Sequence, residues 1–238
     1  MRALHVRPEE GLVTIDFGRP FAYIFEDKDW VSKLLIAGLY AIGGLFCGIG
    51  IFALMGYQKR IAQAVGSGQD VPLPEIGFDR IGEDIVEGLK IFAIYLVYLL
   101  PSIMIQMCAG VANGILSGQG GDARDVGAII SIASMCLYLP LQLIGTFLAP
   151  AGIVRFADQN SLGAAFQLGA VFGFAKKYVV NLLLVFVIGI ASQFIASFSL
   201  ILLCIGIFWG IAFASMVNAH AWGQLLRIGR QDNALVST

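Results

Sequence analysis

The chain has 238 residues, of which 58% are hydrophobic and 13% are charged, and its mean hydropathy is +0.83. About a quarter of the residues of a soluble domain are charged, so this composition excludes an ordinary soluble protein and indicates a lipid bilayer as the solvent. The formal net charge of −1 conceals a strong segregation of charged residues along the chain.

The first thirty residues form a predicted lead-in to the membrane. Residues 1–20 are polar and lack the apolar core of a cleavable signal peptide, so we expect a cytosolic tail. Phe21, Tyr23 and Phe25 then precede a charge cluster that ends at Trp30. Because aromatic rings beside charges suit the lipid headgroup layer, we expect an interfacial helix here, with a short soluble loop as the alternative.

The first apolar run, 34–58, contains no charged residue. Its length fits one membrane-spanning helix, but glycines gather at its centre between Gly43 and Gly50, and each costs a helix roughly 0.5–1 kcal/mol relative to alanine. The run is therefore either one glycine-rich span or two half-helices that turn back inside the membrane. A hairpin of this kind must be covered by protein or water, since broken backbone cannot face lipid.

The distribution of lysine and arginine favours the hairpin. If the first run spans the membrane, the 15 cations divide nine to six between the two sides; if it turns back, they divide fourteen to one. The positive-inside rule prefers the second arrangement. We therefore predict a re-entrant or tightly kinked hairpin at 33–58, within the segment 21–61. Both chain ends are then cytosolic, in a multi-pass protein of the inner (cytoplasmic) membrane.

After this run, we expect a cytosolic connection from Gln58 to Asp79, in which Lys59 and Arg60 mark the membrane interface. Apolar residues at helical spacing then predict an amphipathic surface helix at 79–90. Its acidic residues, together with Glu75 just before it, are expected to be solvated; they are Asp79, Glu83, Asp84 and Glu87.

Two further spans are predicted in the middle of the chain. The first, 89–113, contains Pro101, which should kink the helix. An external loop is expected at 113–124, and the second span, 126–154, contains Pro140 and Pro150.

The stretch 178–219 has forty-two residues without a charge. As one helix it would reach about 63 Å, roughly twice the thickness of a ~30 Å hydrocarbon core. We therefore predict two spans joined by a short turn at the hydroxyl-rich segment 192–199. Before them, Ser161 is expected to cap an amphipathic lead-in helix that ends near Lys177.

The predicted fold is an all-α, polytopic transmembrane bundle of about four full spans, a glycine-rich hairpin and interfacial helices. It forms a single integral membrane domain, 1–238. Within it, the segments 79–157 and 161–228 repeat a unit of one surface helix and two spans, and 21–61 is a shortened copy.

Several short motifs follow one another in a fixed order along the chain. They are Asp29-Trp30, Gly56-Tyr57 with the basic pair after it, Leu73-Pro74-Glu75, Gly88-Leu89, Tyr98-Leu99-Leu100-Pro101 and the segment 220–227. This order resembles a family of prokaryotic multi-pass membrane proteins classed as a domain of unknown function. The resemblance implies an integral membrane protein with no assigned activity and no catalytic residues to transfer. Similar proteins often carry a proline in the middle of the first run, where this chain has Gly48 and Gly50.

No catalytic constellation is apparent, and we expect no cofactor and no metal site. His220, beside Trp222, is expected to be a membrane-interface residue. All carboxylates lie outside the apolar runs, which disfavours a proton-coupled carrier. The four cysteines are expected to be buried, inert thiols; they are Cys47, Cys108, Cys136 and Cys204.

The polar residues inside the apolar runs are neutral. They are Gln106, Gln142, Thr146, Asn181, Gln193 and Asn218. Such residues either form interhelical hydrogen bonds, typically worth ~0.6 kcal/mol each, or line a narrow polar path. Gly206 and Gly210 have the four-residue spacing of close helix packing, within the chain or on a partner.

These observations favour a non-enzymatic structural or accessory subunit that packs in the lipid bilayer against other membrane protein subunits or a second copy of itself. No nucleic-acid partner is expected. The alternative is a permease or channel for a small neutral solute or lipid, built on the helices that Pro101 and Pro140 kink. A lipid-modifying enzyme is disfavoured, because the predicted cytosolic loops lack a cluster of catalytic residue types.

Overall fold

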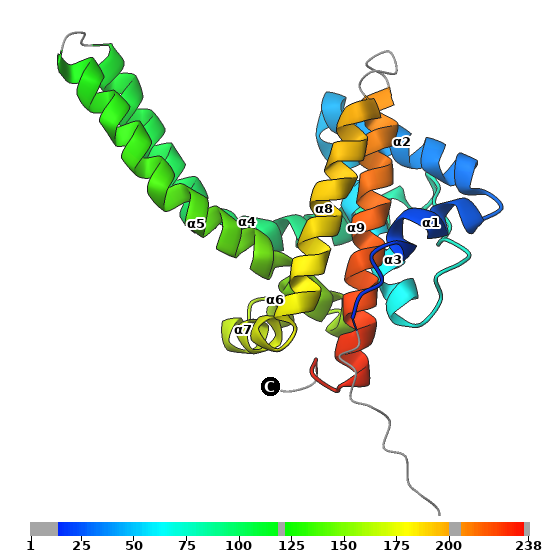
Figure 1. Cartoon of the computed structure of the whole chain (residues 1–238). Helices are drawn as coiled ribbons and strands as arrows, with labels where there is room; N and C mark the ends of the chain where they lie inside the picture. Colours follow the sequence, from blue (N-terminus) through cyan, green and yellow to red (C-terminus); the bar gives the residue numbers. More distant parts are fainter. Residues whose placement is uncertain (1–13, 119–121, 200–205, 236–238) are drawn as a thin grey trace, which may run out of the picture.

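The computed structural model describes residues 14–118, 122–199 and 206–235, and over these ranges every regular element is a helix (Figure 1). The helices are α1 (Arg19–Glu26), α2 (Trp30–Cys47), α3 (Ile49–Gly66), α4 (Ile81–Ser117), α5 (Asp122–Gln159), α6 (Leu162–Ala165), α7 (Leu168–Lys177), α8 (Val179–Phe198) and α9 (Gly206–Gln231). The chain is therefore an all-α helical bundle, as predicted.

Four of the described helices are long and apolar enough to cross a membrane: α2, α4, α5 and α8. The predicted spans 89–113 and 126–154 and the first part of the run 178–219 fall in α4, α5 and α8. The second part of that run falls in α9, which continues past it to the polar residue Gln231. Four apolar helices of this length indicate a membrane protein.

The glycine-rich first run is broken at Gly48, which has a φ of 71° and connects α2 to α3. Only glycine adopts this left-handed backbone conformation without strain. Past the break, Gly50 lies so close to the backbone of Tyr40 and Gly44 that a Cβ atom would overlap it. The helix break predicted in this run is therefore present, and α2 and α3 fold against each other.

The predicted connection from Gln58 to Asp79 begins as a helix, because α3 continues to Gly66. Lys59 and Arg60 do not end the helix; instead they form ion pairs with Glu87 and Asp84 of α4. Because these ion pairs compensate the two positive charges, α3 can continue as a helix past Arg60.

The predicted surface helix at 79–90 is not a separate element, because α4 runs without interruption from Ile81 to Ser117. Pro101 lies inside α4, and Pro140 and Pro150 lie inside α5. Figure 1 shows α4 and α5 as one long hairpin that bends and projects away from the remaining helices. Proline within a helix removes a backbone hydrogen bond and permits such bending. The predicted external loop is correspondingly short, and its residues 119–121 lie outside the described part.

The predicted lead-in helix after Ser161 is divided into α6 and α7. The side chain of Ser161 makes no capping hydrogen bond. Gln167, at the interruption, instead accepts a hydrogen bond from the Arg155 guanidinium at 2.9 Å.

The predicted turn at 192–199 is wrong, because α8 continues to Phe198. The serine hydroxyls there donate hydrogen bonds back along the helix, from Ser192 to the Gly189 carbonyl and from Ser197 to the Gln193 carbonyl. Serine that bonds to the preceding turn is tolerated within a helix. The connection to α9 begins at Ser199, and residues 200–205, which include Cys204, lie outside the described range.

Tyr23, one of the aromatic residues expected in the headgroup layer, is fully buried against α9. Its hydroxyl donates a hydrogen bond to the carbonyl of Met216 at 2.9 Å. Phe25 remains exposed. The contact with Met216 of α9 holds α1 in the core, and the local sequence pattern gives no sign of this distant partner.

The first described residues lie against the last helix. The backbone N–H of Asp16 donates to Oε1 of Gln224 in α9 at 2.8 Å, and that of Ile15 donates to Oδ1 of Asn181 at 3.1 Å. Figure 1 shows this initial segment beside the C-terminal half of α9. The beginning and the end of the described chain therefore lie at the same end of the bundle.

Candidate functional site

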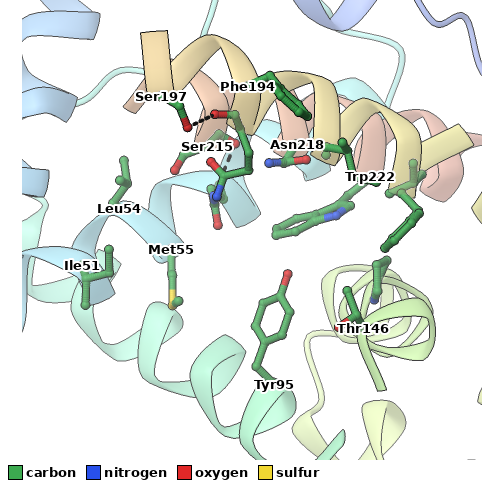
Figure 2. A pocket seen from close by; sticks show the side chains of 17 residues that line it. Ile51, Leu54, Met55, Tyr95, Thr146, Phe194, Ser197, Ser215, Asn218 and Trp222 are labelled. Atoms are coloured by element: carbon green, nitrogen blue, oxygen red, sulfur yellow. Dashed lines mark hydrogen bonds between the residues drawn. The ribbon is translucent and has the colours of Figure 1, made fainter. Parts of the chain in front are cut away.

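A cavity of about 640 Å³ lies between α3, α4, α5, α8 and α9; we call it the neutral cavity (Figure 2). None of its lining residues is charged. Figure 2 shows Tyr95 from α4 and Trp222 from α9 pointing into the same space, with Thr146 from α5 beside them. Its other polar residues are Gln58, Gln193, Ser197, Ser215 and Asn218.

Part of this polar lining is held by the cavity wall. The amide of Gln58 donates to the carbonyl of Ser215, and the amide of Asn218 donates to the hydroxyl of Ser192, both at 3.3 Å. The arrangement offers hydrogen bonds and apolar contacts, but no formal charge. It can therefore bind a neutral molecule and has no group to balance an ion.

The four amides predicted as polar-path or packing residues do not converge on this cavity. Asn218 lines it, together with Thr146 and Gln193. Gln142 accepts a hydrogen bond from Ser102 at 2.8 Å between α5 and α4. Asn181 is buried at the beginning of α8, where it receives the N–H of Ile15.

Gln106, the fourth amide, is exposed on α4, and its side chain has no hydrogen bond to any described residue. The glycine pair on α9 has a different environment. A Cβ atom at Gly210 would overlap Ser199 and crowd Ala196 of α8, so this glycine allows α8 and α9 to approach closely. Gly206 is the first residue of α9.

The prediction of buried cysteines is wrong for the three described ones. Cys47, Cys108 and Cys136 are free thiols on the exposed surface of apolar helices. A thiol is apolar enough to lie on a lipid-facing surface as well as in a protein core. Within the described ranges, no three His, Cys, Asp or Glu side chains are grouped in a way that could hold a metal ion.

Sequence patterns missed a group of ion pairs that joins α2, α3 and α4, which we call the ion-pair cluster. Arg60 of α3 forms a two-point contact with Asp84 of α4, and Lys33 of α2 lies 3.1 Å from Asp27. The prediction that Asp84 is solvated is wrong, since only 2% of it is exposed. Its burial follows from the close crossing of α3 and α4, which covers both partners.

The loop between α3 and α4 completes the ion-pair cluster through its backbone. The N–H of Leu73 donates to Asp27, and the carbonyl of Leu73 accepts from Lys33 at 2.8 Å. The next two carbonyls, of Pro74 and Glu75, accept hydrogen bonds from Tyr57 and Arg60. Three consecutive residues of this loop are therefore fixed to α2 and α3.

Asp27 is charged in this environment. Burial raises the pKa of its carboxyl, but hydrogen bonds from the N–H groups of Asp29 and Leu73 and from the Lys33 ammonium outweigh burial. The pKa of Asp27 is therefore lower than that of an ordinary aspartate.

Two glycines let α3 and α4 cross at backbone distance. A Cβ atom at Gly56 of α3 would overlap the carbonyl oxygen of Asp84, and one at Gly88 of α4 would overlap that of Phe52. The two contacts are reciprocal and four residues apart on each helix. This crossing brings the carboxylate of Asp84 within reach of Arg60.

A second buried cation lies next to this crossing. The Lys59 ammonium is 2.6 Å from both Glu87 and the amide oxygen of Asn160, and it lies 4.3 Å from the centre of the Phe156 ring. Lys59 therefore joins α3 to α4 and to the end of α5.

His220, expected at the membrane interface, is fully buried within the protein. Its ring packs 4.2 Å from that of Tyr23, and its Nδ1 lies 3.2 Å from the amide nitrogen of Gln224. Its Nε2 lies 3.9 Å from a carboxylate oxygen of Asp70.

Residues 41–205 match the family model described as "Protein of unknown function (DUF4013)". This match covers more than half of the chain. The chain belongs to the DUF4013 family. The predicted resemblance to a family of unknown function is thereby confirmed. No curated protein and no solved structure matches the chain.

The DUF4013 match contains most of the contacts described above. Gly56, Arg60, Gly88 and the loop carbonyls of 73–75 all lie inside it, so the α3–α4 crossing belongs to the family domain. The motifs Gly56-Tyr57 with its basic pair, Leu73-Pro74-Glu75 and Gly88-Leu89 therefore have a structural role: they fix α3, the following loop and the start of α4 to one another. None of these contacts forms a nucleophile and base pair of the kind used in covalent catalysis.

Proposed function

We propose that this DUF4013 protein is a non-enzymatic subunit of the inner (cytoplasmic) membrane that packs against the spans of another membrane protein. The observation that carries the proposal is the projecting α4–α5 hairpin (Figure 1). Beyond its base, its apolar side chains are exposed on both helices, as at Met104, Ile132 and Leu137. A hairpin that leaves its own bundle has its surface available to a neighbour.

One side of α4 has the composition of a helix-packing surface. Gln106, Gly110 and Gly114 follow one another at four-residue spacing and are exposed. A Cβ atom at either glycine would meet no atom within 4 Å. Small residues permit close approach of a second helix, and an amide inside an apolar segment gains from a hydrogen-bond partner that lipid tails cannot supply.

The proposed topology has both chain ends in the cytosol and α2–α3 as a re-entrant hairpin. The helix break at Gly48 supports the hairpin, and the hydrogen bond between Asp16 and Gln224 supports ends on one side. The fourteen-to-one division of cations that this topology produces supports a cytosolic location for that side.

Site-specific photo-crosslinking in native membranes tests the subunit proposal. A photoreactive residue is placed at Gly110, and a matched control at Val111, which is also exposed but points to a different side of α4. We expect Gly110 to give a discrete adduct with a membrane protein or a second copy, and Val111 to give lipid adducts. Lipid adducts alone at both positions contradict the proposal.

A second candidate function is the binding or passage of a small neutral solute or lipid. The neutral cavity favours it, because amide and hydroxyl groups from α3, α5, α8 and α9 surround a space without charge. No Asp, Glu, Lys, Arg or His side chain lines this cavity, which favours a neutral solute over an ion.

Reconstituted vesicles test this second candidate. Glycerol permeability and the transbilayer movement of a labelled neutral lipid are measured for the wild type, for Asn218→Leu and for Thr146→Val. Gln142→Leu is the control, because Gln142 bonds to Ser102 outside the cavity. We expect flux that the first two variants reduce and the control preserves. Wild-type vesicles no more permeable than empty ones contradict it.

A further inference from the structure

A groove of about 510 Å³ lies between α5, α7 and α8. It shares Phe186 with the neutral cavity but has a different lining, which is apolar except for one ammonium group. Leu143 and Phe147 of α5, Phe172 of α7 and Leu183 of α8 are among its apolar residues, and Lys176 of α7 is the exception. The groove therefore combines a surface for a hydrocarbon chain with a single positive charge.

Two adjacent lysines at the end of α7 have different environments. The Lys177 ammonium lies 3.2 Å from the Asp232 carboxylate and 5.0 Å from the centre of the Tyr178 ring. Lys176 lines the groove and is exposed, and its ammonium group has no ion pair or hydrogen bond with any residue in the described ranges. Of the two charges, only that of Lys176 is available to a ligand in the groove.

The position of the groove indicates the source of that ligand. Its two long walls, α5 and α8, are among the helices long and apolar enough to cross a membrane. The short helix α7 closes one end, where Leu168 and Phe172 are each 62% exposed. A short helix with exposed apolar residues and terminal lysines is typical of the membrane surface, with its ammonium groups at headgroup level.

We infer that this groove holds one acyl chain of an anionic glycerophospholipid, whose headgroup phosphate is bound by Lys176. The charge determines the class of lipid, because an unpaired ammonium at the membrane surface attracts an anionic headgroup more strongly than a zwitterionic one. The inference rests on the membrane placement proposed above, and it adds a lipid of defined charge to the packing role.

Native mass spectrometry of the full chain tests this inference. The protein is released from micelles that contain equal amounts of phosphatidylglycerol and phosphatidylcholine, and the bound lipids are counted. We expect the wild type to retain phosphatidylglycerol preferentially. Lys176→Gln should reduce this preference about five-fold, which corresponds to ~1 kcal/mol for one lysine near the surface. Lys177→Gln is the matched control and should leave it unchanged, because Lys177 is held by Asp232.

A second pair of variants tests whether the acyl chain binds in the groove. Leu183→Trp fills the groove and should reduce retention of both lipids, whereas Val187→Trp, on the same helix but outside the groove, should not. Equal retention of the two lipids by the wild type overturns the inference, and so does an equal effect of Lys176→Gln and Lys177→Gln. Displacement of the bound lipid by free glycerol phosphate also overturns it, since the site would then bind a soluble anion.

Vesicle flotation, measured on the same preparations, separates this inference from the proposed function. If the protein floats with vesicles but shows no preference for the anionic lipid, the lipid inference is contradicted and the membrane placement is retained. If the protein does not float, the lipid inference and the membrane placement are both contradicted.

Discussion

The guanidinium of Arg60 donates two hydrogen bonds to the carboxylate of Asp84, from Nε at 2.8 Å and from Nη2 at 2.6 Å. The two residues lie on α3 and α4, on either side of the loop that the ion-pair cluster holds. A two-point contact of this kind fixes orientation as well as distance. It therefore sets the register in which α4 leaves the bundle and begins the projecting hairpin.

Removal of one partner from this pair should destabilise the protein strongly. Asp84→Asn leaves the Arg60 charge at a largely covered position, and loss of one member of a buried pair costs about 3 kcal/mol. Unfolding in detergent, followed by circular dichroism, measures the change. Lys90→Met is the control: Lys90 pairs with Glu87 at a more exposed position, so its loss should cost under about 1 kcal/mol. Equal effects of the two substitutions would show that the contact between Arg60 and Asp84 does not set the register of α4.

Gly88→Ala should force α3 and α4 apart. The added methyl group would overlap the carbonyl oxygen of Phe52, so the backbone must shift, and overpacking of this kind typically costs 1–3 kcal/mol, so we expect about 3 kcal/mol. Gly82→Ala, in the first turn of the same helix, meets no neighbouring atom and should be neutral or slightly stabilising. Thermal unfolding of both variants checks this. A tolerated Gly88→Ala would show that the helices do not cross at backbone distance.

Stability should fall in acid through Asp27. The pKa of its carboxyl is lower in the folded protein than in the unfolded chain, so its charged form stabilises the fold at every pH above the unfolded value of about 4. This contribution decreases as the pH falls below that value and through the lower folded pKa. Unfolding followed between neutral pH and the acid range should therefore show a steeper loss for the wild type than for Asp27→Asn. Parallel curves for the two proteins would contradict the assignment.

Arg155→Lys should loosen the region around α6 without unfolding the chain. The buried guanidinium donates to the carbonyls of Ala164 and Leu235 and to the side chain of Gln167, a three-way contact that one ammonium cannot reproduce. Hydrogen exchange should increase in 162–168, whereas exchange in the α3–α4 crossing should stay unchanged. Uniform protection across both regions would show that Arg155 does not hold α6.

The sequence was sufficient to predict the solvent, the fold class and the helix break in the first run. Hydropathy and composition are summed over many residues, so local exceptions do not disturb them. The break at Gly48 was predictable because several glycines weaken the helix in one place. The turn expected at 192–199 was wrong for a local reason. The serine hydroxyls that suggested a loop donate hydrogen bonds to carbonyls of the preceding helical turn.

The ion-pair cluster and the neutral cavity were beyond sequence reasoning. Asp84 is solvated or buried according to where α3 lies, and the neutral cavity brings Gln58 to Ser215 across 157 residues of chain. A usable signal was nonetheless present. Lys59 and Arg60 precede Asp84 and Glu87, which share one face of α4, so two helices joined by a loop could have paired these charges.

The topology of the chain is tested most directly by the location of its two ends. Reporters that fluoresce or are enzymatically active on only one side of the inner membrane are fused separately to the beginning and the end of the chain. Within the described ranges, the first segment and α9 lie together through Asp16 and Gln224. We expect both reporters to give the cytosolic signal in intact cells. Signals from opposite sides would mean that the α2–α3 segment crosses the membrane, and would contradict the proposed arrangement.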